Sequence, residues 1–565
     1  MNQHATTVSA GNRIVQVTAT FLMALTDPKI RSFNADWKER VSVPEWLIRP
    51  LSDAENSALV PTGSASPTVI NQNNRISQRV FDPTASWPLL STREISDLQN
   101  KGSSAAMVGQ GLSALDDSVP HALAQNTQDI SLCFFFRHYA GTTFDPESRN
   151  SFNQLWQPMY LQAPIQSSLR LATSAVTVHI AKIWRLWACT AQAVRSLFIR
   201  AVATTQKSLQ EPEQSSTDTI LMTILVFDVY DALLLHYDPS PVDYGKHKYG
   251  ALAVVEHRGF ANLATPRARI LTAAVRHTLL SHVLSSREGF PERLDFLFRH
   301  PSMNDTKAAK LDHICVQLSR VQKRLWTRRK NLSERRRESY KDIIAEALQV
   351  EQLLLDWEAS ITNPDWLPQY VPRDLVKESI QISGFYGTSC IVWEDLDLGD
   401  MWVLFSMRYL LALQIIRQAC VDDSNFSRNG EHEALVSKTN KKAQKVIDFV
   451  CGTVPFFLGD RVVPKPPTDS ISISFPYKVM RDPKTGVPKC VPGSKSSHHK
   501  QAAASGGWIL FPYLVNVWRL AEPEDDALSI TLRQGQLEWI KAQVKRMQNV
   551  FQFCEPVWFK RHLAT

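Results

Sequence analysis

Closely spaced cysteines are the most informative absence in this 565-residue chain. It has eight cysteines, and the two nearest in sequence, Cys390 and Cys420, are 30 positions apart. Compact zinc sites use Cys-x-x-Cys pairs or similarly short spacings, so the spacing excludes such a site. So few cysteines also exclude a secreted disulfide scaffold. We therefore expect reduced, mostly buried thiols, as in a cytosolic or nuclear protein.

Glycine and long uncharged apolar runs are scarce as well. The 21 glycines fall well below the usual share of about 7%, which argues against a turn-rich all-β protein. The two most apolar stretches, 220–235 and 401–416, are interrupted by Asp228 and Asp231 and by Arg408. Because charge is costly in lipid, we expect no membrane-spanning segment, and we expect no signal peptide.

Helical periodicity dominates the chain from residue 129 onward. Apolar residues recur every three or four positions, which places them on one face of a helix. The predicted helices cover 165–187, 217–235, 267–284, 311–332, 340–357, 401–420 and 534–553. Pro164 is expected in the first turn of the first helix, and Thr217 is expected to cap the second. Strand-like alternation is clear only at 470–475. The sequence predicts an all-α fold, an irregular multi-helix assembly packed through ridges and grooves.

The domain organisation follows from where this periodicity begins. Residues 1–128 are rich in Ser, Ala, Asn and Gln and show little periodicity, so we expect a weakly structured, largely disordered N-terminal region. Residues 129–565 are predicted to form one helical domain. Within it, residues 462–505 contain seven prolines, and we expect a mobile loop there.

Positive charge is concentrated in one segment. Residues 320–337 contain nine basic side chains and one acidic one, so this segment alone accounts for the net charge of +8. Within it, two basic blocks separated by ten residues have the layout of a bipartite nuclear import signal, whose lysines and arginines bind an acidic carrier. The candidate signal consists of Lys323, Arg324, Arg335, Arg336 and Arg337. The alternative is a solvated helix face opposite Leu318, Val321 and Leu325.

Common catalytic motifs are missing. The chain has no phosphate-binding G-x-x-x-x-G-K-[ST] loop and no G-x-S-x-G nucleophile elbow. Residues 109–114 fit G-x-G-x-x-A, but no hydrophobic strand precedes them. His432-Glu433 begins like a zinc-binding H-E-x-x-H motif and lacks the second histidine. We therefore expect no enzyme activity and no cofactor.

One acidic stretch keeps an enzyme open as an alternative. Its members are Glu394, Asp395, Asp397 and Asp400. Carboxylates can hold Mg²⁺ against a diphosphate, which would suit an all-α, terpene-type enzyme that uses a diphosphate substrate. Gly399 lies inside the stretch and no second ligand set is evident, so a solvated helix N-terminus is the preferred interpretation. Among the histidines, His138 is expected in the core, and His498-His499 is expected as a surface loop pair.

Six short segments in order suggest a family. They are 218–230 (DTILMTILVFDVY), 247–252 (HKYGAL), 258–259 (RG), 446–458 (VIDFVCGTVPFFL), 506–512 (GGWILFP) and 536–540 (QLEWI). From about residue 129 to the C-terminus, their order and spacing resemble the fungal-specific transcription factor domain. That domain is the all-helical regulatory region that usually follows a binuclear zinc cluster. The motif residues of interest are His247, Gly250, Ala251, Arg258, Gly259, Gly507, Pro512 and Trp539.

These motif residues are interpreted as architecture rather than chemistry. Small side chains at Gly250 and Ala251 are expected to allow close helix packing. Arg258-Gly259 is expected to end a helix, with the glycine in the left-handed conformation. Gly506-Gly507 is expected to loosen the chain ahead of a buried helix.

The resemblance implies a nuclear transcriptional regulator that recruits other transcription factors or coregulators and controls a metabolic or secondary-metabolite gene set. Members commonly dimerise, which leaves a homodimer open. The family reads DNA with six closely spaced cysteines around two zinc ions, and the cysteine spacing here excludes that module from this chain. DNA is therefore expected to be reached indirectly, through a partner or through a module encoded upstream. A non-catalytic interaction scaffold is a further alternative.

Overall fold

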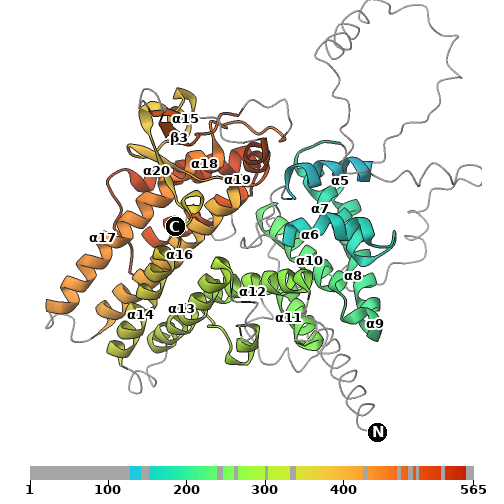
Figure 1. Ribbon diagram of the computed structural model, residues 1–565, viewed down its shortest axis with the longest axis horizontal. Coiled ribbons are helices and arrows are strands. Elements are labelled where there is room, and N and C mark those ends of the chain that lie inside the picture. Colours follow the sequence, from blue (N-terminus) through green and yellow to red (C-terminus); the bar gives the residue numbers. More distant parts are fainter. Residues whose placement is uncertain are drawn as a thin grey trace, which may run out of the picture. The chain divides into compact units, whose positions relative to one another are not determined.

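The fold is all-α, as predicted, in the part of the chain that the computed structural model describes (Figure 1). The described residues are 127–140, 152–187, 189–237, 246–259, 265–298, 303, 305–330, 339–423, 430–467, 473–481, 488–490, 496–523 and 528–554. The predicted disordered region lies outside them except for its last two residues, which already belong to the first described helix.

A first group of helices forms the blue-green to green part of Figure 1. Its bounds are α5 Thr127–His138, α6 Phe152–Gln162, α7 Ser168–Ile183, α8 Ala191–Gln210, α9 Pro212–Ser215, α10 Asp218–Tyr237, α11 Lys246–Arg258 and α12 Pro266–Ser286. Helix α10 is apolar on most faces and packs against α7, α11 and α12, because a helix without a polar face must be covered on all sides. Thr217 caps α10 as predicted, its hydroxyl accepting from the Ile220 amide at 3.3 Å. Helix α7 begins at Ser168 behind a Ser167 cap, so the predicted start at Pro164 is wrong.

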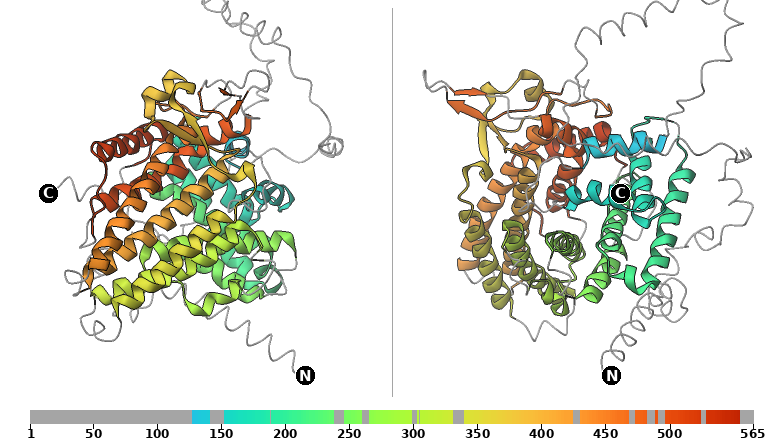
Figure 2. Two further views of the ribbon diagram at one scale, coloured as in Figure 1. Left: turned by 60° about the vertical axis from the view of Figure 1, so that its left-hand side comes forward. Right: turned by 45° about the vertical axis from the view of Figure 1, so that its right-hand side comes forward.

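Four long helices make up the second group and lie side by side (Figures 1 and 2). They are α13 Lys307–Lys330, α14 Tyr340–Ala359, α16 Leu396–Asp422 and α17 Gly430–Gly452. The short 3-10 helix η6, Glu292–Phe298, precedes α13. Helix α13 packs against α14 and α16, and α16 against α14 and α17. Leu318, Val321 and Leu325 are buried on the inner face of α13, as the periodicity predicted.

The remaining elements cover one end of these groups. They are the 3-10 helices η9 Pro364–Trp366 and η10 Arg373–Leu375, the helices α15 Glu378–Gly384, α18 Val454–Leu458, α19 Ser496–Ala521 and α20 Gln536–Phe551, and the strands β1 Gln369–Pro372, β2 Ser389–Val392, β3 Val479–Arg481 and β4 Pro488–Cys490. The strands form two antiparallel pairs, β1 with β2 and β3 with β4. Helix α19 contacts α5, α16, α17, α18 and α20, so it joins the first two groups.

The segment predicted as a mobile loop contains regular structure. Residues 462–505 include β3, β4 and the first ten residues of α19. The strand-like alternation at 470–475, which lies in the segment predicted as a loop, forms no strand in its described part, 473–475. His498 and His499 lie in the first turn of α19, where His498 packs on Phe456 with ring centroids 4.3 Å apart. They are therefore not a pair in an exposed loop.

An aromatic cluster forms where α10 meets α19 and the end of α20. The His236 ring lies 5.0 Å from that of Trp508 and 5.1 Å from that of Phe553. The Tyr237 hydroxyl donates to the Phe551 carbonyl at 3.0 Å. These contacts join residues more than 250 positions apart, so they tie the first group of helices to the C-terminal ones.

Two helices are long and apolar enough to cross a membrane by length and composition alone. They are α10 and α16, in which 61% and 78% of the apolar stretch is buried inside the protein. Helices at the centre of a core have this property too. The expectation of no membrane-spanning segment stays a prediction.

Candidate functional site

Helix α13 has two features that are candidates for a functional site: a pocket beside its N-terminal half and a basic segment in its C-terminal half. The helix begins behind Thr306, whose hydroxyl accepts from the Ala309 amide at 3.1 Å. Its apolar face is buried against α14 and α16. The N-terminal half borders a pocket, and the C-terminal half carries the described part of the basic segment.

The basic end of α13 is largely matched by neighbouring groups. Arg329 pairs with Asp422 at 2.9 Å, and Arg320 pairs with Asp295. The Arg328 guanidinium lies 4.0 Å from the centre of the Tyr340 ring, and Arg287 and Arg329 both lie over the ring of Trp326. Much of the local charge is therefore used to bind α12, α14 and α16 to α13.

The candidate import signal is described only in its first block. Lys323 is exposed, and its aliphatic stem lies against Gly289. Arg324 is half-buried and pairs with Glu346 of α14. Arg335, Arg336 and Arg337 lie outside the described residues. The described block therefore offers one exposed lysine and an arginine held by an acid, and the import signal stays a prediction.

Residues in and beside the motif segments of α10 and α11 form two ion pairs and a hydrogen bond in a row, which we call the α10–α11 charge register. Asp218 pairs with Arg258, Asp228 with Lys248 at 3.1 Å, and Asp231 with the His247 Nδ1 at 2.6 Å. The residue numbers of the acids rise along α10 while those of their partners fall along α11, as expected for two antiparallel helices. Burial raises the pKa of the Asp228 carboxyl, an effect that the nearby Lys248 partly offsets.

His247 contacts aromatic rings as well as Asp231. Besides its bond to Asp231, its ring contacts those of Phe227 and Phe198, with centroids 5.3 and 6.1 Å away. The sequence motif included His247 and Arg258, but we did not predict their partners on α10. Three acids in an otherwise apolar helix were the available signal.

The motif glycines play roles that differ from those expected. A methyl group at Gly250 would meet no atom within 4 Å, so the predicted close approach there is wrong, although Ala251 is buried. Gly506 and Gly507 lie inside α19, where a methyl group would come within 3.0 Å of Phe457 and of Phe551, respectively. They allow close packing and do not loosen the chain before a helix.

The remaining motif residues occupy structural positions. Gly259 follows the last residue of α11 with φ of 60°, and its amide donates to the Val255 carbonyl at 3.2 Å, so the predicted helix end is confirmed. Pro512 lies within α19. The Trp539 ring of α20 packs on Tyr386, with centroids 5.0 Å apart. None of these residues adjoins the pocket of α13.

The acidic stretch lies at the start of α16, as the preferred interpretation expected. Asp395 is the N-cap and accepts from the Leu398 amide at 2.9 Å. Glu394 pairs with Lys478, and Asp400 accepts from the Tyr513 hydroxyl at 2.9 Å. Three of the four carboxylates therefore have structural contacts: one caps a helix, one forms an ion pair and one accepts a hydrogen bond. The described part of the chain has no group of three or more His, Cys, Asp or Glu side chains placed to hold a metal.

The cysteines that can be assessed are free, and most of them are buried. Cys315, Cys390, Cys420 and Cys451 are buried, whereas Cys133 is exposed. Burial raises the pKa of the Cys420 thiol to about 11, which disfavours the thiolate that metals and electrophiles require. His138 is buried too, as expected.

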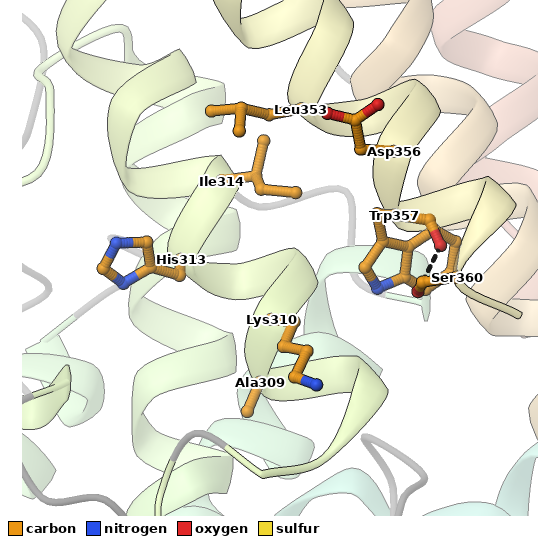
Figure 3. Close-up of a pocket in the computed structure, with 8 residues that line it drawn as sticks. All are labelled: Ala309, Lys310, His313, Ile314, Leu353, Asp356, Trp357 and Ser360. Atoms are coloured by element: carbon orange, nitrogen blue, oxygen red, sulfur yellow. Dashed lines mark hydrogen bonds between the residues drawn. The ribbon is translucent and has the colours of Figure 1, made fainter.

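An open pocket of about 460 Å³ lies between α13 and α14 (Figure 3). It is lined by Ala309, Lys310, His313, Ile314, Leu353, Asp356, Trp357 and Ser360. Its base is apolar, and its charged members are exposed. We did not predict this pocket from the sequence, because its two walls come from helices that each look like ordinary amphipathic helices.

Comparison of the chain with models of known protein families, with curated proteins and with solved structures finds no match. Its function must therefore be inferred from its residues and their geometry.

Proposed function

We propose that this chain is a nuclear transcriptional regulator of the fungal zinc-cluster type that lacks its own DNA-binding cluster. It acts through helical surfaces that bind other transcription factors or coregulators. It reaches DNA through such a partner, and the genes it controls belong to a metabolic or secondary-metabolite set.

The α10–α11 charge register is the observation that carries this proposal. The motif that suggested the family includes both helices, and its polar members hold the two helices together instead of surrounding a substrate. A regulatory domain that acts by binding other proteins needs a stable helical surface, so its sequence motifs are expected to consist of residues required for packing. The motif glycines of α19 support the same conclusion, because they set helix spacing.

A reporter assay tests the regulatory role. The full chain is fused to a heterologous DNA-binding domain, and transcription is measured from a promoter that carries the matching site. We expect a change of at least about threefold in either direction relative to the DNA-binding domain alone. Asp228→Lys, which places two cations together in the charge register, is expected to reduce the effect, and the Asp228→Lys/Lys248→Asp swap is expected to restore it. A fusion that leaves transcription unchanged at normal protein levels would contradict the proposal.

Nuclear import is tested separately by imaging. Replacing the five residues of the candidate signal by alanine is expected to shift the tagged protein to the cytoplasm, because the carrier loses its charge-assisted contacts. The matched control removes three exposed lysines of α17, Lys438, Lys441 and Lys445, and is expected to leave localisation unchanged. Nuclear accumulation of the five-residue variant would rule out this segment as the signal.

A further inference from the structure

The pocket between α13 and α14 has no part in the function proposed above. We propose that it binds a small amphipathic carboxylate, a molecule with a flat apolar body of one or two rings and a single carboxylate group. The inference stands apart from transcription, because binding can be measured on the purified chain alone.

The base of the pocket is apolar and held in place. The Trp357 indole N–H donates to the Lys307 carbonyl at 2.8 Å, and the ring stacks on Phe405 with centroids 5.0 Å apart and planes inclined by 25°. Trp357 therefore cannot turn away without losing both contacts. Ile314 and Leu353 extend the apolar surface across the two helices (Figure 3). A flat apolar body would bury this surface at little cost in side-chain ordering.

The size of the pocket suits a small molecule. Its volume of about 460 Å³ falls in the range of about 300–1,000 Å³ usual for small-molecule sites. The pocket is open on one side, so part of the ligand stays in contact with water. A charged group on the ligand is therefore best placed at the rim, where its hydration is kept.

The rim selects the sign of that charge. Lys310 is exposed, and no acidic side chain pairs with it in the described part of the chain. Asp356, at the other end of the rim in Figure 3, accepts from the neutral Gln352 amide at 2.8 Å and keeps its negative charge, so a ligand carboxylate is best placed at the Lys310 end, away from Asp356. The Lys307 ammonium is also occupied, donating to the Ser360 carbonyl at 2.8 Å. Lys310 therefore offers a charge to an incoming anion.

The backbone adds to this preference. Lys310 lies in the first turn of the 24-residue helix α13, where the positive end of the helix dipole favours negative charge. A carboxylate at Lys310 would interact with both the ammonium and the dipole while its rings lie over Trp357. This combination distinguishes the site from an apolar hollow that accepts neutral molecules equally well.

Titration calorimetry on the full-length chain tests the inference. The probes are 1-naphthoate and its neutral counterpart 1-naphthamide. We expect the carboxylate to bind about two- to fivefold more tightly than the amide, the equivalent of one favourable charge contact at an exposed site. Lys310→Glu is expected to weaken naphthoate binding about tenfold or more and to leave naphthamide binding unchanged, whereas Lys310→Arg keeps the preference.

Two further variants locate the binding. Lys330→Glu changes another exposed lysine, at the other end of α13, and is expected to bind both probes like the unmodified protein. Leu353→Asp places a charge on the apolar base and is expected to abolish binding of both probes, with helix content checked by circular dichroism. Because Lys310 is exposed, its replacement does not threaten the fold. The proposal would be overturned if neither probe binds, if both probes bind with equal affinity, or if the Lys310→Glu protein binds naphthoate normally.

Discussion

Glycines inside helices show how much a single methyl group can matter. Gly250 in α11 and Gly506 in α19 are both helical, and their sequences do not distinguish them. At Gly250 an added methyl group meets open space, whereas at Gly506 it collides with the backbone of Phe457 in α18. The same change therefore acts in opposite directions at the two positions.

Alanine substitutions test this contrast. Gly250→Ala is expected to raise the free energy of unfolding by about 0.5–1 kcal/mol, because alanine loses less backbone entropy in a helix. Gly506→Ala is expected to lower it by about 1–3 kcal/mol, because α18 and α19 must move apart. Guanidinium unfolding followed by circular dichroism measures both. Equal effects at the two positions would show that the α18–α19 contact is not as close as described.

Pairs of helices are held together by charges as well as by apolar contact. In the α10–α11 charge register, each acid of an otherwise apolar helix has a partner on the next helix. A buried or half-buried carboxylate without a partner is costly, so the pairs specify how α11 lies on α10. Apolar packing alone would allow neighbouring registers at similar free energy.

A double-mutant cycle on Asp228 and Lys248 measures this contribution. Each single alanine substitution is expected to destabilise the protein, with a coupling free energy of about 1 kcal/mol between the two sites. The exposed pair Arg293–Glu256, at 3.0 Å, is the matched control and is expected to couple by less than about 0.5 kcal/mol. A coupling for Asp228–Lys248 no larger than that of the exposed pair would contradict a specifying role.

At the scale of the whole molecule, two half-buried histidines link stability to pH. Burial lowers the pKa of His236 to about 4 and that of His498 to about 3, both from an ordinary value of 6.5. The His236 ring packs against Trp508, and the His498 ring packs on Phe456, whose carbonyl accepts a hydrogen bond from His498 Nε2 and only partly offsets the effect of burial on the pKa. They are therefore neutral in the folded state, while the unfolded chain takes up protons below pH 6.5.

Stability is therefore expected to be steady above pH 6.5 and to fall as the pH drops from 6.5 towards 4, by up to about 1.4 kcal/mol per pH unit for each histidine. Unfolding midpoints in guanidinium at pH 7 and pH 5 measure the loss. The double variant His236→Phe/His498→Phe is expected to lose less stability between these pH values than the unmodified protein. Trp539→Phe, the control, removes part of an aromatic contact with Tyr386 and is expected to lower stability at both pH values alike. An unchanged pH dependence in the double histidine variant would contradict the assignment.

Local pattern located seven of the sixteen described α-helices and some of their ends. The apolar spacing in 217–235 and 401–420 predicts α10 and much of α16, and the cap at Thr217 and the left-handed Gly259 were predicted correctly. Helix α19 was missed at its start, where proline, serine and histidine suggested a loop. Its first turn is stabilised by Phe456 and Phe475, which lie 20 to 40 residues earlier in the chain.

The amino-acid sequence by itself determined that the chain is helical, where seven of the sixteen described α-helices run and which of their residues face inward, because those properties depend on neighbours three or four positions away. Only the tertiary structure decided which acid meets which base across α10 and α11, which glycines lie under another backbone, and that α13 and α14 enclose a pocket beside Lys310. These are contacts between residues separated by tens to hundreds of positions, and periodicity within one helix holds no information about the partner that another helix brings to it.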